Sequence, residues 1–338
     1  MHIFDITMPQ KNVIPLEIEE QEQGDSLSVV LKPEILDLSR LEKGCGKAFW
    51  RPESLDQYQG QTNIKEILNG YISGCKQYSK VFPHFLISGR AGGGKTALAY
   101  ILAKQLRVPF VETVANTIKS PNQFIDLLIK ANGGIVYLDE LQVINKTIAN
   151  WTLPLLEDFQ INGSPIKPFT LFGATTELGT LIKKYKPLID RFKLNVCLAP
   201  YSIDELSVLI KQYAQKNFPT FKTVDENYKE IAKNSRSTPR TGIRLLESFI
   251  YMDKPLTEIF QAYNIIYNGF VSDDIKVLKL LAENPKGVGL NSIASYLQTS
   301  QENFLFTNEA YMIEQGLITI GSRRQITIKG LELLKELE

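Results

Sequence analysis

The sequence predicts an α/β protein in which a parallel sheet is followed by a helical region and then by a small C-terminal unit of helices and a hairpin. Three observations lead to this prediction. Short apolar runs at residues 85–88 and 135–138 have the length and composition of buried parallel strands. Residues 201–268 place apolar side chains at helical spacing throughout. Residues 317–328 contain two short strand-like runs around a glycine-containing turn.

The first strand leads into residues 89–96, Gly-Arg-Ala-Gly-Gly-Gly-Lys-Thr, which have the spacing of a phosphate-binding loop. A helix-forming run, residues 97–103, follows, as this motif requires. Backbone N–H groups of such a loop surround the phosphates of a nucleoside triphosphate, the lysine reaches the β- and γ-phosphates, and the threonine holds Mg²⁺. A glycine-rich turn with a chance lysine is the alternative. The predicted ATP-binding residues of the loop are Gly89, Gly92, Gly94, Lys95 and Thr96.

Arg90 is the unusual residue inside this loop. Its side chain either forms a salt bridge at the surface or contacts nucleotide or a neighbour. The sequence favours the surface salt bridge, because exposed arginines commonly pair in this way.

The second strand, residues 135–138, ends in Asp139 and Glu140. Ligands collect at the carboxyl ends of parallel strands, so both carboxylates are predicted to face the nucleotide. Asp139 would bind Mg²⁺ directly or through water, and Glu140 would polarise the water that attacks the γ-phosphate. A solvated Asp-Glu pair in a turn is the alternative.

Two later positions are also predicted to act on ATP. The apolar run at residues 169–174 ends in Thr175 and Thr176, and Thr176, or less favourably Thr175, would orient the attacking water. Simple capping of the strand end is the alternative. Arg191 lies at an element boundary, where it forms a local salt bridge or serves as an arginine finger for a neighbour's nucleotide.

Length, charge and cysteine usage limit the class of protein. A chain of 338 residues suits two or three domains, and a net charge of +1 favours no partner class. The three cysteines show no paired spacing, and the chain has only two histidines, so a disulfide framework and a zinc site are not expected. Neither a signal peptide nor a membrane-spanning run is evident, which predicts a cytoplasmic protein without a membrane partner.

The predicted domains are an acidic N-terminal extension (1–40), a large nucleotide-binding domain (41–200), a helical domain (201–268) and a C-terminal domain (269–338). The extension carries eight acidic and three basic side chains. It is interpreted as a solvated surface. The more specific alternative is an arm that docks a protein partner.

In the C-terminal domain, three helices (273–283, 290–297 and 308–315) precede a hairpin whose tip contains Arg323 and Arg324. This arrangement predicts a winged helix, a relative of the helix-turn-helix. The domain is not basic overall, so binding to DNA would depend on these two arginines. A small helical domain that contacts only protein is the alternative.

These motifs, in this order, resemble the RuvB family of AAA+ ATPases, which are motors of Holliday junctions. The resemblance covers about residues 49–338 and includes segments similar to the family's opening, sensor-1, finger, sensor-2 and wing motifs, at residues 51–61, 169–176, 188–192, 238–240 and 287–290. It implies an AAA+ fold with a helical lid and a winged helix. It also implies recognition of adenine and ribose by Arg51, Tyr201 and Arg240. Arg191 would act in trans within a ring, presumed hexameric, and Arg323 would lie on the DNA-facing wing.

The sequence departs from the family's pattern at several places. Arg90 and Ala91 replace two prolines, Gln142 replaces a histidine, and Ile189 replaces an arginine. Only nine residues, 160–168, stand where the family has a long hairpin that docks on its partner RuvA. The sequence therefore predicts that the RuvA-docking surface is lost.

The sequence thus predicts an ATP-hydrolysing ring motor that acts on duplex or branched DNA. The alternative is a RuvA-independent AAA+ loader or regulator that remodels or recruits a protein partner on DNA. The winged helix and the complete catalytic set favour the motor, whereas the short hairpin and acidic extension favour the loader. A structural ring that binds ATP without cycling is a third, weaker possibility.

Overall fold

The structure is a computed structural model that describes residues 51–161 and 163–337. The chain divides into two compact units, Met1–Ala48 and Phe49–Glu338, and the described residues all belong to the second. The expected acidic extension, residues 1–40, lies outside the described residues. Within the described ranges, no helix combines the length and the apolar character that crossing a bilayer requires.

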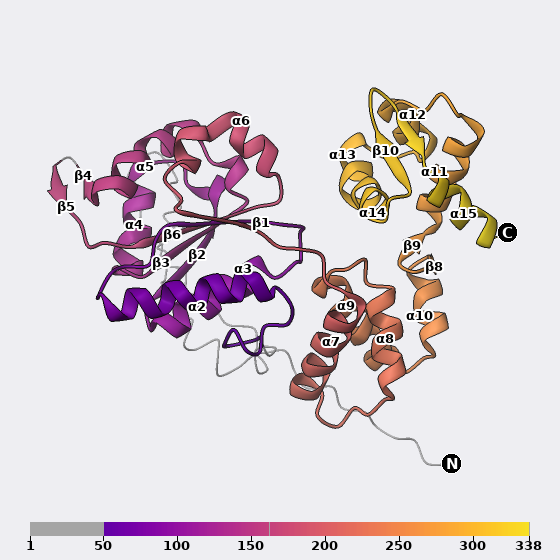
Figure 1. Ribbon diagram of the computed structural model, residues 1–338, viewed down its shortest axis with the longest axis horizontal. Coiled ribbons are helices and arrows are strands. Elements are labelled where there is room, and N and C mark those ends of the chain that lie inside the picture. The colour runs from indigo at the N-terminus through magenta and orange to yellow at the C-terminus, as the bar shows by residue number, and fades with distance from the viewer. Residues whose placement is uncertain (1–50, 162, 338) are drawn as a thin grey trace, which may run out of the picture. The chain divides into compact units, whose positions relative to one another are not determined.

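Five parallel strands form the main sheet, in the order β2-β3-β6-β1-β7 (Figure 1). Every residue of β1 and β6 is buried, because helices cover both faces of the sheet. The predicted α/β fold is confirmed. The strands are β1 (Phe85–Ser88), β2 (Phe110–Val114), β3 (Ile135–Asp139), β6 (Thr170–Thr175) and β7 (Leu194–Cys197).

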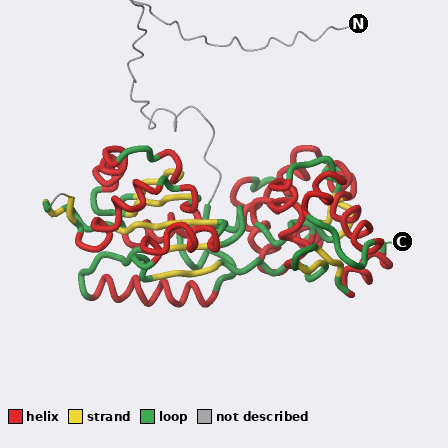
Figure 2. Tube along the Cα trace, turned by 90° about the horizontal axis from the view of Figure 1, so that it is seen from above, coloured by secondary structure: helices red, strands yellow, loops and turns green. Residues whose placement is uncertain are grey.

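Alternate residues of the central strands pack into two separate cores. Ile135 and Tyr137 of β3 lie in the core shared with α2 and α3. Val136 and Leu138 lie in the core shared with α4, α5 and α6. This alternation follows from the two-residue period of a strand, and Figure 2 shows the strands with helices on both sides. The helices are α2 (Thr62–Gln77), α3 (Lys95–Leu106), α4 (Pro121–Ala131), α5 (Lys146–Asp158) and α6 (Leu178–Ile189).

The strand register brings the functional segments to one edge of the sheet. Ser88 of β1 lies opposite Thr175 of β6, and Leu138 of β3 lies opposite Gly173. The chain therefore leaves β1, β3 and β6 at the same edge, where the phosphate loop, Asp139 and Thr176 follow. Short 3₁₀ turns lie after β2 (Ala115–Thr117) and β3 (Leu141–Val143).

Between α5 and β6 the chain forms a small antiparallel hairpin of two residues a side, β4 (Gln160–Ile161) and β5 (Ser164–Pro165). A short hairpin is thus present where the resemblance implied a long one. Its strands are too brief to offer the apolar surface of a longer ribbon.

The helical region contains α7 (Ile203–Asn217), α8 (Asp225–Lys233), α9 (Pro239–Met252) and α10 (Leu256–Ala262). Ser202 caps α7 with a complete capping box, since its hydroxyl accepts from the Glu205 N–H and Glu205 accepts from the Ser202 N–H. The prediction that residues 201–268 are entirely helical is wrong at the end. There β8 (Ile265–Tyr267) pairs with β9 (Phe270–Val271), a pair too short to show period-two alternation.

The C-terminal unit contains α11 (Ser272–Glu283), α12 (Leu290–Tyr296), α13 (Gln301–Phe304), a π-helical turn (Leu305–Glu309), α14 (Ala310–Glu314), β10 (Ile318–Ile320), β11 (Arg324–Ile326) and α15 (Ile328–Glu336). The third helical segment begins at Gln301, not at residue 308, because the Ser300 hydroxyl caps it by accepting from the Asn303 N–H. The second of the two strand-like runs predicted within residues 317–328 is also corrected: it spans Arg324–Ile326, and residue 328 begins α15.

Candidate nucleotide-binding site

The phosphate loop joins β1 to α3 in a conformation that requires glycine. Gly92 and Gly94 have φ angles of 74° and 97°, in the left-handed region that other residues rarely adopt. A Cβ at Gly92 would lie 2.6 Å from the Cβ of Arg240, and one at Gly94 would lie 2.7 Å from the Tyr58 hydroxyl. The loop is therefore closely enclosed by Arg240 on one side and Tyr58 on the other.

Lys95 is the first residue of α3 and is only 6% exposed. Its Nζ donates to the carbonyl oxygens of Gly89 at 2.9 Å and Arg90 at 3.0 Å. Burial lowers the pKa of this ammonium, and the carboxylates of Asp139 and Glu140 oppose that shift. A phosphate chain in the loop would replace the carbonyl partners of Lys95 with charged ones.

Thr96 and Asp139 are linked through Tyr137. The Thr96 hydroxyl lies 3.0 Å from the Tyr137 hydroxyl, which donates to Oδ1 of Asp139 at 3.3 Å. Burial raises the pKa of Tyr137, so that its hydroxyl stays protonated and can donate. A hydroxyl and a carboxylate held at one sheet edge are oxygen donors suited to Mg²⁺. One hydroxyl and one carboxylate leave further coordination positions to water and phosphate oxygens, which is how Mg²⁺ is commonly held beside a nucleotide.

Glu140 follows Asp139 in a left-handed conformation, φ 51° and ψ 52°. Its Oε2 accepts from the Thr176 hydroxyl at 2.8 Å and from the Gln142 amide at 2.5 Å. The side-chain oxygen of Gln142, Oε1, in turn accepts from the Thr175 hydroxyl at 2.6 Å. The carboxylate of Glu140 is thus oriented by side chains from two chain segments.

The same contacts distinguish the two threonines. Thr175 is fully buried, and its hydroxyl accepts from the Glu177 N–H at 3.0 Å, which is a capping role. Thr176 contacts Glu140 directly.

Gln142 was not predicted as a site residue. The available signal was a single amide in the otherwise apolar run Leu141–Ile144.

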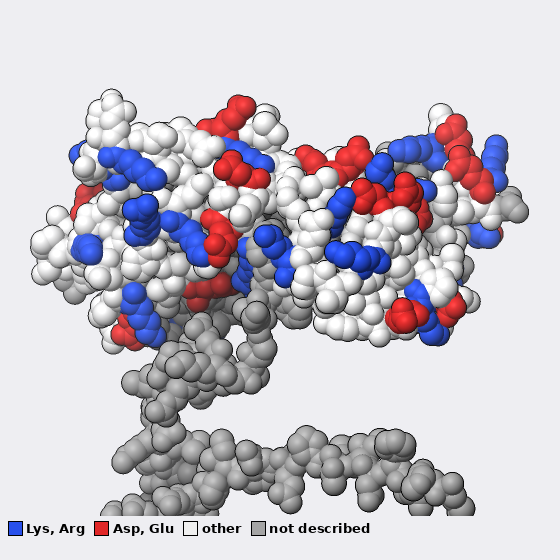
Figure 3. All heavy atoms as spheres, turned by 90° about the horizontal axis from the view of Figure 1, so that it is seen from below, with Lys and Arg blue, Asp and Glu red and all other residues white. Residues whose placement is uncertain are grey.

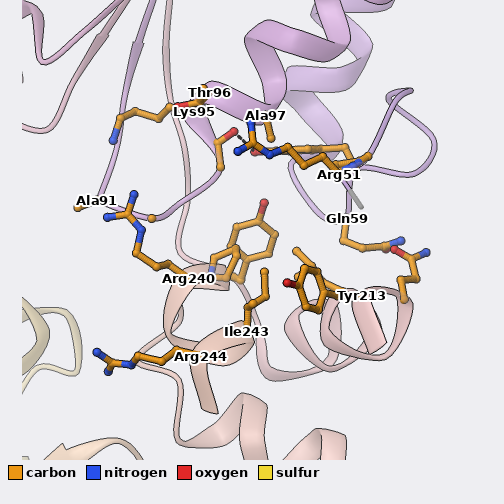
Figure 4. Close-up of a pocket in the computed structure, with 18 of the residues that line it drawn as sticks. Arg51, Gln59, Ala91, Lys95, Thr96, Ala97, Tyr213, Arg240, Ile243 and Arg244 are labelled. Carbon is orange, nitrogen blue, oxygen red and sulfur yellow. Dashed lines mark hydrogen bonds between the residues drawn. The ribbon is translucent and has the colours of Figure 1, made fainter. Parts of the chain in front are cut away.

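A cavity of about 700 Å³ lies between the loop and the helical region. Figure 4 shows Arg51, Lys95 and Thr96 on one side of it, and Arg240 and Tyr213 on the other. The Arg240 backbone N–H donates to the Gly92 carbonyl at 3.4 Å. Of the predicted residues, the cavity lining includes Arg51, Gly92, Gly94, Lys95, Thr96, Asp139, Glu140, Tyr201 and Arg240.

Several lining residues were not predicted. Tyr58 lies next to Gly94, and its hydroxyl donates to the Gly94 carbonyl at 3.4 Å. At the helical end, the Tyr213 hydroxyl donates to Oε1 of Glu247 at 2.6 Å, and Ile243 adds an apolar wall. Tyr213, Ile243 and Glu247 occupy ordinary helical positions in the sequence, and Tyr58 lies in a turn before α2, so no local pattern marked them as site residues.

Arg191 is not among the described residues that line this cavity. It follows α6, which is kinked at Tyr185, and its guanidinium pairs with Glu157 at 2.8 Å. Among the described residues its buried Nε has no hydrogen-bond partner. The structure therefore contains the local salt bridge that the sequence allowed for Arg191.

The two arginines of the C-terminal hairpin differ in environment. Arg323 is exposed at the turn, with one contact to the Gly287 carbonyl at 3.3 Å. Arg324 instead lies in β11, where it pairs with Glu309 at 2.7 Å, and both side chains are largely buried. The prediction that Arg324 lies at the tip is wrong, because the strand register places it opposite Ile320.

Two family models match the chain. The model described as the Holliday junction DNA helicase RuvB P-loop domain matches residues 50–198, and the RuvB C-terminal winged helix domain matches residues 267–335. The Holliday junction branch migration complex subunit RuvB of Campylobacter lari is 32% identical over 311 residues, covering 84% of this chain and 91% of the relative. The Thermotoga maritima subunit is 31% identical over 328 residues, covering 89% and 97%.

A solved structure, the Thermotoga maritima RuvB Holliday junction branch migration motor, has a TM-score of 0.74 and 31% identity to this chain. The match covers 85% of this chain and 99% of the Thermotoga maritima chain. The predicted resemblance is thereby confirmed in both sequence and fold. This chain belongs to the RuvB family of AAA+ ATPases.

Proposed function

We propose that this protein is an ATP-driven ring motor that acts on duplex or branched DNA, as its relatives named for Holliday junction branch migration do. The observation that carries the proposal is that Lys95, Thr96, Asp139 and Glu140 all line one cavity at the phosphate loop. The family membership and the C-terminal winged helix support DNA as the substrate on which hydrolysis is used.

ATP would bind with its phosphates in the loop and its base toward the helical region. Lys95 neutralises β- and γ-phosphate charge, while Arg51, Tyr201 and Arg240 hold the nucleoside portion. Burial raises the pKa of Tyr201 to about 12, which keeps this side chain neutral beside the base. Thr96 and Asp139 would hold Mg²⁺, which neutralises charge on the phosphates.

Hydrolysis depends on a water aligned for attack on the γ-phosphate. Glu140 takes the role of general base, and Thr176 and Gln142 fix the direction in which its carboxylate points. Thr176 also offers a hydroxyl that can orient the water. This assignment makes Gln142 a positioning residue, since it acts through Glu140.

Arg191 would complete the site of a neighbouring subunit. Arg191 is not among the described residues that line the cavity, and its ion-pair partner Glu157 is exposed; both support a finger that acts in trans within a hexameric ring. Exchange of Glu157 for a γ-phosphate is favourable, because phosphate carries more charge and offers more acceptors.

We assign residues 41–200 to the ATPase domain, 201–268 to a lid and 269–338 to a winged helix, with the β8–β9 hairpin at the last boundary. Basic and acidic side chains are interspersed among the described residues on the face in Figure 3. DNA contact is therefore assigned to Arg323 on the exposed turn, and Arg324 is assigned the task of holding β11 in place.

The second candidate is a loader or regulator that recruits a protein partner, and one observation favours it. The hairpin at β4 and β5 is two residues long on each side, so a partner that docks on a long apolar hairpin has little to contact. Residues 1–40 would then supply the alternative docking segment.

The deciding experiment measures ATPase activity of the full chain with and without a four-way DNA junction, together with strand exchange of a labelled junction. We expect DNA-stimulated turnover and junction movement, both lost in Lys95→Ala. Turnover that responds only to a protein partner, with no junction movement, would instead establish the loader.

A further inference from the structure

Arg90 extends out of the phosphate loop and contacts the winged helix. Its NH1 pairs with Oε2 of Glu314, at the end of α14, at 2.6 Å. The guanidinium also lies 5.8 Å from the ring centroid of Tyr311, one turn earlier in the same helix. The Arg90 and Glu314 side chains are 29% and 20% exposed, so the pair is partly shielded from solvent.

Arg236 strengthens this contact from the lid. The Arg90 guanidinium donates to the Arg236 carbonyl at 3.4 Å, and the Arg236 guanidinium lies 5.1 Å from the Tyr311 ring centroid. Arg236 is itself anchored in the winged helix, since its Nε donates to the Gly269 carbonyl at 2.7 Å and it pairs with the fully buried Asp274. Tyr311 is therefore bound by one arginine from the loop and one from the lid.

The backbone of Arg90 faces the nucleotide site. Its carbonyl oxygen accepts from Nζ of Lys95 at 3.0 Å and from the Gly93 N–H at 3.1 Å. Lys95 has three N–H donors and uses two of them on the carbonyls of Gly89 and Arg90, so bonds to both the β- and γ-phosphates compete with the bond to the Arg90 carbonyl. One residue thus connects the phosphate-binding lysine to α14 of the winged helix.

We propose that Arg90 is a positioning residue that couples nucleotide occupancy of the phosphate loop to the winged helix through Glu314 and Tyr311. A change in the loop is transmitted to α14, and through α14 to the adjoining strand β10. The inference depends on the proposed nucleotide site but not on the DNA structure that the protein acts on. A bare surface ion pair would show no response to nucleotide, so the two interpretations separate experimentally.

The test is hydrogen–deuterium exchange of the full chain with and without ATPγS, read at amides of residues 305–326. Nucleotide binding is followed separately with a fluorescent ATP analogue. Couplings between sites commonly change an equilibrium about 5- to 150-fold, so we expect nucleotide to change exchange in this segment by at least about fivefold. Glu314→Gln should bind nucleotide as the parent does and lose most of this response.

Glu258→Gln is the matched control, because it removes one carboxylate charge from an exposed pair with Lys254, 3.0 Å away on the lid. The double variant Arg90→Glu with Glu314→Arg restores opposite charges and should recover part of the response. The proposal is overturned if exchange in 305–326 ignores bound nucleotide, or if Glu314→Gln responds like the parent. If the analogue does not bind at all, the proposed function falls as well, and the titration identifies that case.

Discussion

Glu140, which we propose as the general base, is held in one orientation by its neighbours. The left-handed backbone at Glu140 turns its carboxylate away from the strand direction and toward Thr176 and Gln142. A non-glycine residue in this conformation is uncommon, and such positions concentrate at functional sites. The bonds to Thr176 and Gln142 stabilise an orientation that the backbone alone would not favour.

One substitution at Glu140 and one at Gln142 should separate the general-base role of Glu140 from the orientation of its carboxylate. Glu140→Gln should bind ATP normally and lose about 10²- to 10⁴-fold in kcat, the usual contribution of a general base. Gln142→Ala should lower kcat by about tenfold with little change in nucleotide affinity, because it removes one hydrogen bond to a charged group. Steady-state ATPase and analogue binding measure both. A larger loss of kcat in Gln142→Ala than in Glu140→Gln would contradict the assigned roles.

His84 gives a residue-scale prediction about stability. It is 7% exposed, its Nε2 lies 3.0 Å from the Leu156 carbonyl, and its Nδ1 accepts from the Leu171 N–H at 2.9 Å. Burial lowers its pKa to about 4, against an ordinary value of 6.5. At a pH between 4 and 6.5 the ring is protonated in the unfolded chain but neutral in the folded chain. The contribution of the neutral ring to stability is therefore complete above pH 6.5 and is lost as pH falls toward 4.

We expect the free energy of unfolding to fall by about 2.5 kcal/mol between pH 7 and pH 4.5 through this group. Urea denaturation at a series of pH values measures it. His84→Gln removes the titrating ring and should flatten this part of the profile, even if the variant is less stable throughout. An unchanged slope in His84→Gln would show that other groups carry the pH dependence.

At the scale of elements, the sequence predicted those strands and loops that a short local pattern determines. Residues 85–88, 135–138 and 169–174 are short and mainly apolar, which indicated buried parallel strands and hence one catalytic edge. The motif spacing then assigned Lys95 and Asp139 correctly to that edge. Gln142 and Tyr58 were missed because their roles depend on segments that meet only in the folded chain.

The C-terminal hairpin shows the same limit. Its existence followed from the apolar runs around Gly321, but its register did not, because period-two patterns of three residues allow several pairings. The actual register pairs Ile320 with Arg324 and so moves Arg324 from the turn into the strand. Its partner Glu309 lies in a π-helical turn that no sequence pattern indicated.

This register predicts different outcomes for the two arginines. Arg323→Ala should weaken binding to duplex DNA and reduce the slope of log affinity against log salt by about 0.9, the value for one phosphate contact. Arg324→Ala should instead destabilise the winged helix by about 3 kcal/mol, since it leaves Glu309 buried without its partner. Fluorescence anisotropy at several salt concentrations and thermal unfolding distinguish them. Equal losses of DNA affinity without loss of stability would contradict the distinction.

At the scale of the whole molecule, the chain contains a nucleotide site that lacks one expected component. The side chains to which we assign phosphate binding, metal binding and water activation line one cavity, yet Arg191 is directed to Glu157. An arginine that contacts the transferred phosphate is the part such sites use to stabilise transition-state charge. A second copy of the chain is the natural source of this arginine, so catalysis and assembly should depend on each other.

Arg191→Ala therefore should bind ATP with parental affinity and lose about 10³- to 10⁵-fold in kcat. Mixing it with an excess of Lys95→Ala, which has an intact Arg191 but no working phosphate loop, should restore turnover at mixed interfaces. Glu157→Gln is the matched control, because it frees Arg191 without removing it and should leave kcat at or above the parental value. ATPase assays across mixing ratios, with assembly followed by sedimentation velocity, provide the measurement. If Arg191→Ala turns over normally, or if mixing restores nothing while mixed assemblies form, Arg191 does not act across the subunit interface.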